Sequence, residues 1–105
     1  MTYTVQLTDQ AKTDLRGIYE YIALTLLEPE TAKNLTRRII SGLHSLKEMP
    51  NRYPVYQDEP WRSRGLRRIN IENFSSFYLV TEDSVQVIRI MYKRRDISNI
   101  LKESD

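Results

Sequence analysis

The chain has 105 residues, a formal net charge of +2 at pH 7, no cysteine and a single histidine. This length supports one modest hydrophobic core, so we expect a single domain over residues 1–105. The composition argues against disulfides, a thiolate site or a zinc site, and we expect no metal and no other cofactor. We also expect no signal peptide and no membrane contact, hence a cytoplasmic protein, because no apolar run is long enough to cross a bilayer.

The amino-terminal half predicts a short strand followed by two helices. Residues 3–7 alternate and are rich in β-branched and aromatic side chains, which favours a strand. Thr8 suits the N-cap of a helix over about 9–27, and Pro29 suits the first turn of a second helix that ends before Pro50. Apolar residues recur at helical spacing in both, namely Ala11, Leu15, Ile18, Tyr19, Ile22 and Leu26, then Ala32, Leu35, Ile39, Leu43 and Leu46. The short connection predicts an antiparallel helix hairpin.

The carboxy-terminal half predicts a loop, three strands and a short helix. The proline-rich residues 50–65 show no regular period, and we expect their aromatic side chains, Tyr53, Tyr56 and Trp61, to pack on the helices. Residues 66–71, 74–80 and 84–92 are rich in Val, Ile, Tyr and Phe, and short polar breaks separate them. They predict an antiparallel meander, followed by a terminal helix with Asp96 as a possible cap. The fold class is therefore α+β, in the order β-α-α-β-β-β-(α), with the helix hairpin packed on a small antiparallel sheet.

Alternation along the strands predicts which side chains face the helices. In strand 66–71 we expect Ile69 and Ile71 to face the helices, which leaves Arg68 on the opposite, open face. In the last strand we expect Ile88 and Ile90 to face the helices, so that Arg89 joins Arg68. The middle strand has no polar alternation, which leaves it without an orientation and compatible with burial on both faces.

Positive charge is concentrated near both ends of the meander. The candidates for binding a target or partner are Arg62, Arg64, Arg67, Arg68, Arg89, Lys93, Arg94 and Arg95. Two interpretations stay open: a solvated strand edge that discourages edge-to-edge pairing, or a docking site for an acidic partner. The sequence makes it plausible that the 62–68 and 93–95 clusters lie close together, but does not establish it. We interpret His44 as a partly exposed helix residue, Tyr19 and Tyr21 as core and rim, and Trp61 as a loop anchor.

The predicted order of elements resembles the RelE/ParE superfamily of bacterial toxins. The same resemblance is carried by four stretches in sequence order, YEYI, SLKEMPNRYP, GLRRINIENFSSFYLV and VQVIRIMYKRRDI, which together span essentially the whole chain. The resemblance implies the toxin of a type II toxin–antitoxin module, of the kind associated with plasmid stabilisation, whose partner is an antitoxin encoded beside it. Within the superfamily, ParE-like members poison DNA gyrase, whereas RelE-like members cut mRNA on the ribosome.

The resemblance also implies which residues an mRNA-cutting member needs. These are alternating basic residues on the first meander strand, an arginine after the next turn, an arginine after the last strand, and a tyrosine near the carboxy terminus. Leu66 and Arg68 occupy the alternating positions here, Ser75 stands at the second arginine, Arg94 matches the third, and no tyrosine follows Tyr92. Only Arg68 and Arg94 are thus catalytic candidates. We favour a non-catalytic gyrase binder; a ribosome-dependent endoribonuclease is the alternative, and a degenerate member that only pairs with its antitoxin is the third.

Overall fold

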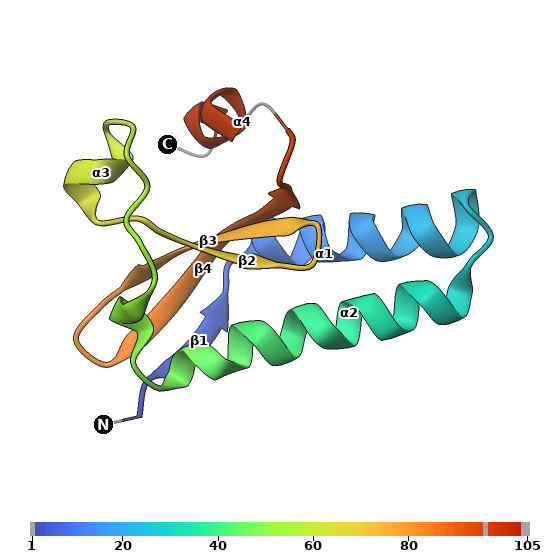
Figure 1. Cartoon of the computed structure of the whole chain (residues 1–105), viewed down its shortest axis with the longest axis horizontal. Coiled ribbons are helices and arrows are strands. Elements are labelled where there is room, and N and C mark those ends of the chain that lie inside the picture. Colours follow the sequence, from blue (N-terminus) through green and yellow to red (C-terminus); the bar gives the residue numbers. More distant parts are fainter. Residues whose placement is uncertain (1, 96, 104–105) are drawn as a thin grey trace.

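The chain folds as a helix hairpin packed on a four-stranded sheet (Figure 1). The computed structural model describes residues 2–95 and 97–103, so the expected cap Asp96 lies outside the described residues. The elements are β1 (Thr4–Leu7), α1 (Asp9–Glu20), α2 (Pro29–His44), α3 (Trp61–Arg64), β2 (Arg67–Ile71), β3 (Phe74–Val80), β4 (Ser84–Tyr92) and α4 (Ile97–Glu103). The strand order is β1-β4-β3-β2, with β1 parallel to β4 and the other pairs antiparallel. The predicted α+β class and meander are confirmed.

The two helices begin at the predicted residues, but the second helix ends earlier than predicted. The Thr8 hydroxyl accepts a hydrogen bond from the Ala11 N–H at 3.1 Å and so caps α1. A π-helical turn, Tyr21–Thr25, extends α1, and α2 starts at Pro29. However, α2 ends at His44 and continues only as a 3₁₀ turn, earlier than predicted. The Ser45 hydroxyl donates to the Gly42 carbonyl at 2.6 Å, a side-chain bond that competes with the helical ladder.

The main core lies between the helix hairpin and one face of the sheet. Its buried hydrophobic residues are Ala11, Ile18, Ile22, Ala23, Ala32, Ile39, Leu43, Leu46, Ile69, Phe74, Tyr78, Val85, Val87 and Ile90. The predicted stripe of the second helix is confirmed, with Leu35 only partly buried. The predicted apolar stripe of the first helix is only partly buried. Tyr19 and Leu26 are exposed, as is Tyr21. Ile22 is buried as predicted, and Ala23 is buried beside it, within the π-helical turn that departs from the spacing assumed for a regular helix.

A β-bulge changes which side chains of strand β4 point toward the helices. Phe77 of β3 pairs with Arg89, but its neighbour Tyr78 pairs with Val87, which leaves Ile88 as an extra residue. Val87 and Ile90 therefore both face the helices, whereas Ile88 packs on the opposite face. The prediction for Ile88 was wrong because strict alternation does not survive the inserted residue.

Strand β2 faces as the alternation predicted. Ile69 is buried in the main core, and Ile71 packs against it from the edge. Helix α2 approaches Ile71 so closely that a Cβ on Gly42 would lie 2.6 Å from the Ile71 Cδ1 atom. A larger residue at position 42 would therefore require the Ile71 side chain to shift.

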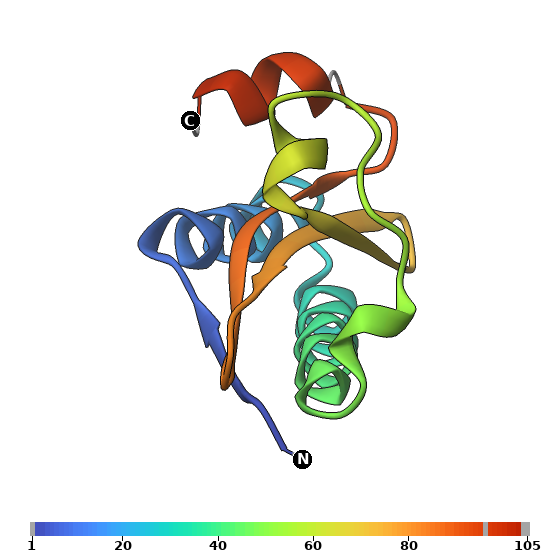
Figure 2. The ribbon, with the colours of Figure 1, turned by 90° about the vertical axis from the view of Figure 1, so that its left-hand side faces the viewer.

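The opposite face of the sheet is covered as well, by short segments from distant parts of the chain (Figure 2). A second cluster consists of Trp61, Leu66, Phe77, Met91 and Leu101, with Tyr56, Ile97 and Ile100 among the partly buried residues around it. Trp61 and Tyr56 thus pack on this far face and not on the helices, whereas Tyr53 does pack against the main core. β3 is covered on both faces, and the open face expected for Arg68 and Arg89 is largely occupied. Among the described helices, none is long and apolar enough to cross a membrane.

Candidate functional site

The two predicted clusters of positive charge do not meet. Arg67, at the start of β2, pairs with Tyr78, whereas Ile71 at the end of β2 and Tyr92 at the end of β4 both pair with Phe74. In a meander the first and third strands run in the same direction, so the beginning of one and the end of the other lie at opposite ends of the sheet. The cluster at 62–68 and the cluster at 93–95 are therefore separate surfaces.

Arg67 is used to hold the loop that follows α2. Its Nη1 atom donates hydrogen bonds to the carbonyl oxygens of Asn51 at 3.0 Å and Tyr53 at 2.6 Å. A neighbouring bond between the Tyr78 hydroxyl and the Pro50 carbonyl, at 2.6 Å, fastens the same loop. A guanidinium that is hydrogen-bonded to backbone carbonyls stabilises the fold, and it contributes less to the binding of a partner than an exposed guanidinium does.

Arg68 belongs to a small polar network on the far face of the sheet. Its Nε donates to Asn70 Oδ1 at 3.2 Å and to Ser75 Oγ at 3.0 Å, and its guanidinium lies 5.6 Å from the centre of the Phe77 ring. The Ser75 hydroxyl also donates to Asn70 Oδ1 at 2.7 Å. Ser75 and Leu66 are fully buried. Two of the positions at which an mRNA-cutting relative is expected to carry cations are thus part of the sheet's packing.

Arg62 and Arg64 lie apart from these two, on the exposed side of the short helix α3. The guanidinium of Arg64 stacks over the indole of Trp61, 5.0 Å from the ring centre. Glu59, just before α3, accepts hydrogen bonds from the Ser63 hydroxyl and backbone N–H, and these bonds lower the pKa of its carboxyl. The run of four arginines is therefore dispersed over three environments.

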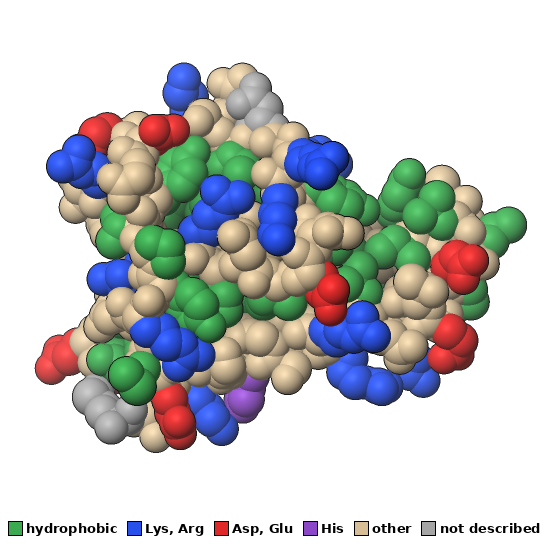
Figure 3. Space-filling view, viewed as in Figure 1, with side chains coloured by type: hydrophobic (Ala, Val, Ile, Leu, Met, Phe, Trp, Pro, Cys, Tyr) green, Lys and Arg blue, Asp and Glu red, His purple; other side chains and the backbone are tan. Residues whose placement is uncertain are grey.

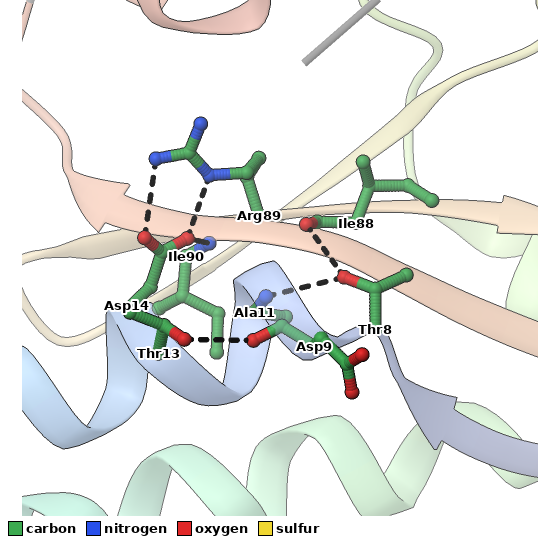
Figure 4. A network of polar contacts seen from close by, with 8 residues as sticks. All are labelled: Thr8, Asp9, Ala11, Thr13, Asp14, Ile88, Arg89 and Ile90. Carbon is green, nitrogen blue, oxygen red and sulfur yellow. Dashed lines mark hydrogen bonds and ion pairs between the residues drawn. The ribbon is translucent and has the colours of Figure 1, made fainter.

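Arg89 is paired with Asp14 of α1 (Figure 4). The Arg89 Nε and Nη2 atoms lie 2.8 Å and 3.1 Å from the two carboxylate oxygens, and the Ile90 N–H donates to the same carboxylate at 2.9 Å. Arg89 shares a cross-strand row with Phe77 and Arg68, as predicted, but the carboxylate of Asp14, which no sequence pattern connects to it, neutralises its charge. Because β1 pairs with β4 only as far as Val87, the carboxylate satisfies a backbone donor beyond the end of β1.

The second cluster, Lys93, Arg94 and Arg95, remains exposed; we call it the basic end. It follows β4 directly, and the Lys93 N–H donates to the Asn73 carbonyl at 3.0 Å, which fixes its backbone beside the β2–β3 turn. The three side chains, with Asn73 and Tyr92, line a hollow of about 740 Å³. The Arg95 guanidinium lies 6.0 Å from the centre of the Tyr92 ring. This surface can attract an anionic partner.

A second hollow, of about 540 Å³, lies between α1, the end of β4 and α4. Its lining includes Gly17, Ile18, Tyr21 and Ile100, and it shares Tyr92 and Arg95 with the hollow at the basic end. A Cβ on Gly17 would meet no atom within 4 Å, so a larger side chain could be placed here without a clash. No sequence pattern predicted this surface, although a glycine inside a helical stripe is a signal for such a site. The two hollows together offer cations beside apolar side chains, which suits a peptide segment carrying both acidic and apolar residues.

The side chain whose pKa is shifted most, Tyr78, lies in neither hollow. Burial raises the pKa of the Tyr78 hydroxyl to about 12, but this residue lies in the main core. Across residues 2–95 and 97–103, no three His, Asp or Glu side chains are grouped so that they could hold a metal ion. The shifted tyrosine therefore belongs to the packing of the core and not to either hollow.

The family of the chain follows from a comparison with models of known protein families. A family model described as the ParE toxin of the type II toxin-antitoxin system, parDE, matches residues 5–97. The solved chromosomal ParDE toxin–antitoxin system of P. aeruginosa is 26% identical, covers 87% of this chain and 96% of that chain, and gives a TM-score of 0.72. The toxin–antitoxin complex RelBE2 of Mycobacterium tuberculosis is 17% identical, covers 89% and 100%, and gives a TM-score of 0.62, a likeness of fold. No curated protein matches significantly.

Proposed function

The chain belongs to the ParE toxin family of type II toxin–antitoxin systems, and from this premise we propose that it inhibits growth by binding DNA gyrase. The observation that carries the proposal is the burial of Leu66 and Ser75 together with the tethering of Arg68. RNA cleavage requires a base, an acid and cations around the reacting phosphate. Two of the positions expected to supply them are closed to a substrate, which favours inhibition by protein binding.

We further propose that an antitoxin encoded beside the toxin neutralises it by covering the basic end. The support is the exposed charge of Lys93, Arg94 and Arg95 and the apolar hollow next to it. Electrostatic complementarity of this kind accelerates encounter and fixes the register of a partner, and adjacent apolar contacts slow its dissociation. An antitoxin segment with both acidic and apolar residues fits both hollows at once.

The target is tested by assaying two activities side by side. Purified toxin is added to a gyrase supercoiling reaction and, separately, to a translating extract whose mRNA is mapped by primer extension. We expect blocked supercoiling and no codon-linked cuts. Clean cleavage in the ribosomal A site, lost in Arg94→Ala, would overturn the proposal and establish a ribonuclease. Loss of a single preorganised charge typically reduces such a rate by about 10²–10³-fold, whereas one contact in a broad interface usually matters less.

The antitoxin surface is tested by charge removal. Replacing Lys93, Arg94 and Arg95 together by Gln should weaken antitoxin binding, and the loss should be greater at low salt because exposed charges are screened within about 8 Å at physiological ionic strength. The matched control removes the same charge from exposed positions of the helix hairpin, Lys12, Lys33 and Arg37. Equal effects of the two triple changes would show that net charge, and not the basic end, governs the affinity.

A further inference from the structure

The tip of the helix hairpin carries hydrophobic side chains that the fold does not bury. Leu24, Leu26 and Leu27 are 69%, 51% and 77% exposed. They lie where α1 and its π-helical turn pass into α2, at the far end of the hairpin and beyond the edge of the sheet (Figure 1). Hydrophobic side chains gather at this right-hand extremity of the molecule in the space-filling view (Figure 3). We call Leu24, Leu26 and Leu27 the leucine tip.

The leucine tip is not explained by the needs of folding. The same turn is already anchored by Ile22 and Ala23, which are buried in the main core. Leu27 has a φ of +56°, a left-handed conformation that glycine adopts without strain and that leucine does not. A glycine would serve the turn better and would remove exposed apolar surface. A strained, exposed leucine among other exposed leucines is typical of a contact surface.

The charge around the leucine tip narrows the choice of partner. Residues 20–32 contain Glu20, Glu28 and Glu30 and no Lys, Arg or His, in a chain whose sequence pI is about 9.0. The first basic residue of α2 is Lys33, one turn further from the tip. Acidic side chains disfavour contact with nucleic acid, and they would face one another if two copies associated tip to tip. The complementary surface is an apolar recess bordered by Lys and Arg side chains.

We propose that the leucine tip is the element of this toxin that docks on its target, in a cation-bordered apolar recess of the DNA gyrase protein. This inference rests on the gyrase target proposed above. An enzyme that handles DNA presents Lys and Arg where phosphates bind, so it offers the charge that the glutamates require. A ribosomal RNA surface would repel them. The tip then contacts the target, whereas the antitoxin binds at the basic end, after β4, and neutralises the toxin by its bulk.

Three substitutions test this role. Leu24→Gln removes an exposed apolar contact, and Leu27→Gly removes another while relieving the left-handed strain. Met49→Gly is the matched control, because Met49 is also apolar, 71% exposed and left-handed, with a φ of +50°, but lies beyond the opposite end of α2. Each variant is measured for inhibition of supercoiling by gyrase holoenzyme, for affinity to the antitoxin by calorimetry, and for melting temperature.

We expect Leu24→Gln and Leu27→Gly each to weaken gyrase inhibition by about tenfold or more, the scale of exposing one leucine side chain. Leu27→Gly should do so with a raised melting temperature, which separates lost binding from lost folding. Met49→Gly should also melt higher but inhibit like the wild type. Antitoxin affinity should be unchanged in all three.

Other outcomes would overturn the inference in distinguishable ways. Full inhibition by both tip variants would refute it and leave the gyrase target standing, whereas a wild type that leaves supercoiling unaffected would refute both. Antitoxin affinity lost in place of inhibition would assign the tip to the antitoxin. Self-association of the wild type, detected by light scattering and lost in Leu27→Gly, would assign it to a second copy of the chain.

Discussion

The two faces of the sheet are covered in different ways. One face lies under two long amphipathic helices, whose buried side chains form the main core. The other face lies under Tyr56 of the loop after α2 and under the short helices α3 and α4. Their side chains form a much smaller hydrophobic cluster. Both exposed hollows border the second kind of cover or the end of β4 beside it. The helix hairpin thus contributes most of the buried core, whereas the two hollows open near the end of β4, where short segments cover the sheet.

The largest expected effect comes from the helix-covered face. Ile39 is fully buried in the main core, and Ile39→Ala should lower the free energy of unfolding by about 2–5 kcal/mol through lost burial and a cavity. The next residue, Ile40, is 49% exposed and is the matched control, with an expected change within about 0.5 kcal/mol. Urea unfolding measures both. Similar effects at the two positions would mean that α2 presents a different face to the sheet.

The edge between the two faces should be somewhat less sensitive. Asp14→Asn removes the charge that pairs with Arg89, and both side chains are mostly buried, at 15% and 13% exposure. We expect a loss of roughly 1.5–3 kcal/mol, the range for hydrogen bonds to charged groups. Asp83→Asn, in the exposed β3–β4 turn, should have little effect. If the two changes were equivalent, the Asp14 carboxylate would not be holding the strand edge.

On the far face, the effect should be local. Leu101 of α4 is fully buried, but α4 has only seven residues, and we expect it to detach without unfolding the hairpin. Leu101→Ala should therefore cost less than the ~2 kcal/mol that usually marks the lower end for a buried leucine. Hydrogen exchange should become faster in α4 while the α2 amides keep their protection. Loss of protection in both helices would show that the two faces unfold together.

The smallest effect concerns the hydrogen bond between β3 and the loop that follows α2. Tyr78→Phe removes the hydrogen bond to the Pro50 carbonyl and should cost about 1 kcal/mol at neutral pH. Burial raises the pKa of Tyr78 from 10.0 to about 12, so its neutral form is favoured in the folded state. The stability that this provides is fully present below pH 10 and is lost as the pH rises through about 12. Wild-type melting temperature should thus fall more steeply across that window than that of Tyr78→Phe; parallel curves would contradict the assignment.

The candidate site was only partly predictable, and the arginines show why. All eight basic candidates were visible as charges, but Arg67, Arg68 and Arg89 are engaged by Tyr53, Ser75 and Asp14, respectively, among other partners. Each of these three partners is at least seven positions away along the chain, so no local pattern announces the contact. The basic end stayed exposed because it follows the last strand, where the described neighbours do not cover it.

Local sequence patterns were enough to predict the order of the elements, the capping of α1 by Thr8, the start of α2 at Pro29, the stripe of the second helix and the inward side of β2. These follow from spacing and from bonds within a few residues. Only the tertiary structure decided that Trp61 and Leu101 meet across the far face, that a bulge turns Ile88 away from the helices, and that the two basic clusters lie at opposite ends of the sheet. The physical reason is that strand register and inter-element contacts join residues far apart in sequence, whose pairing no local periodicity encodes.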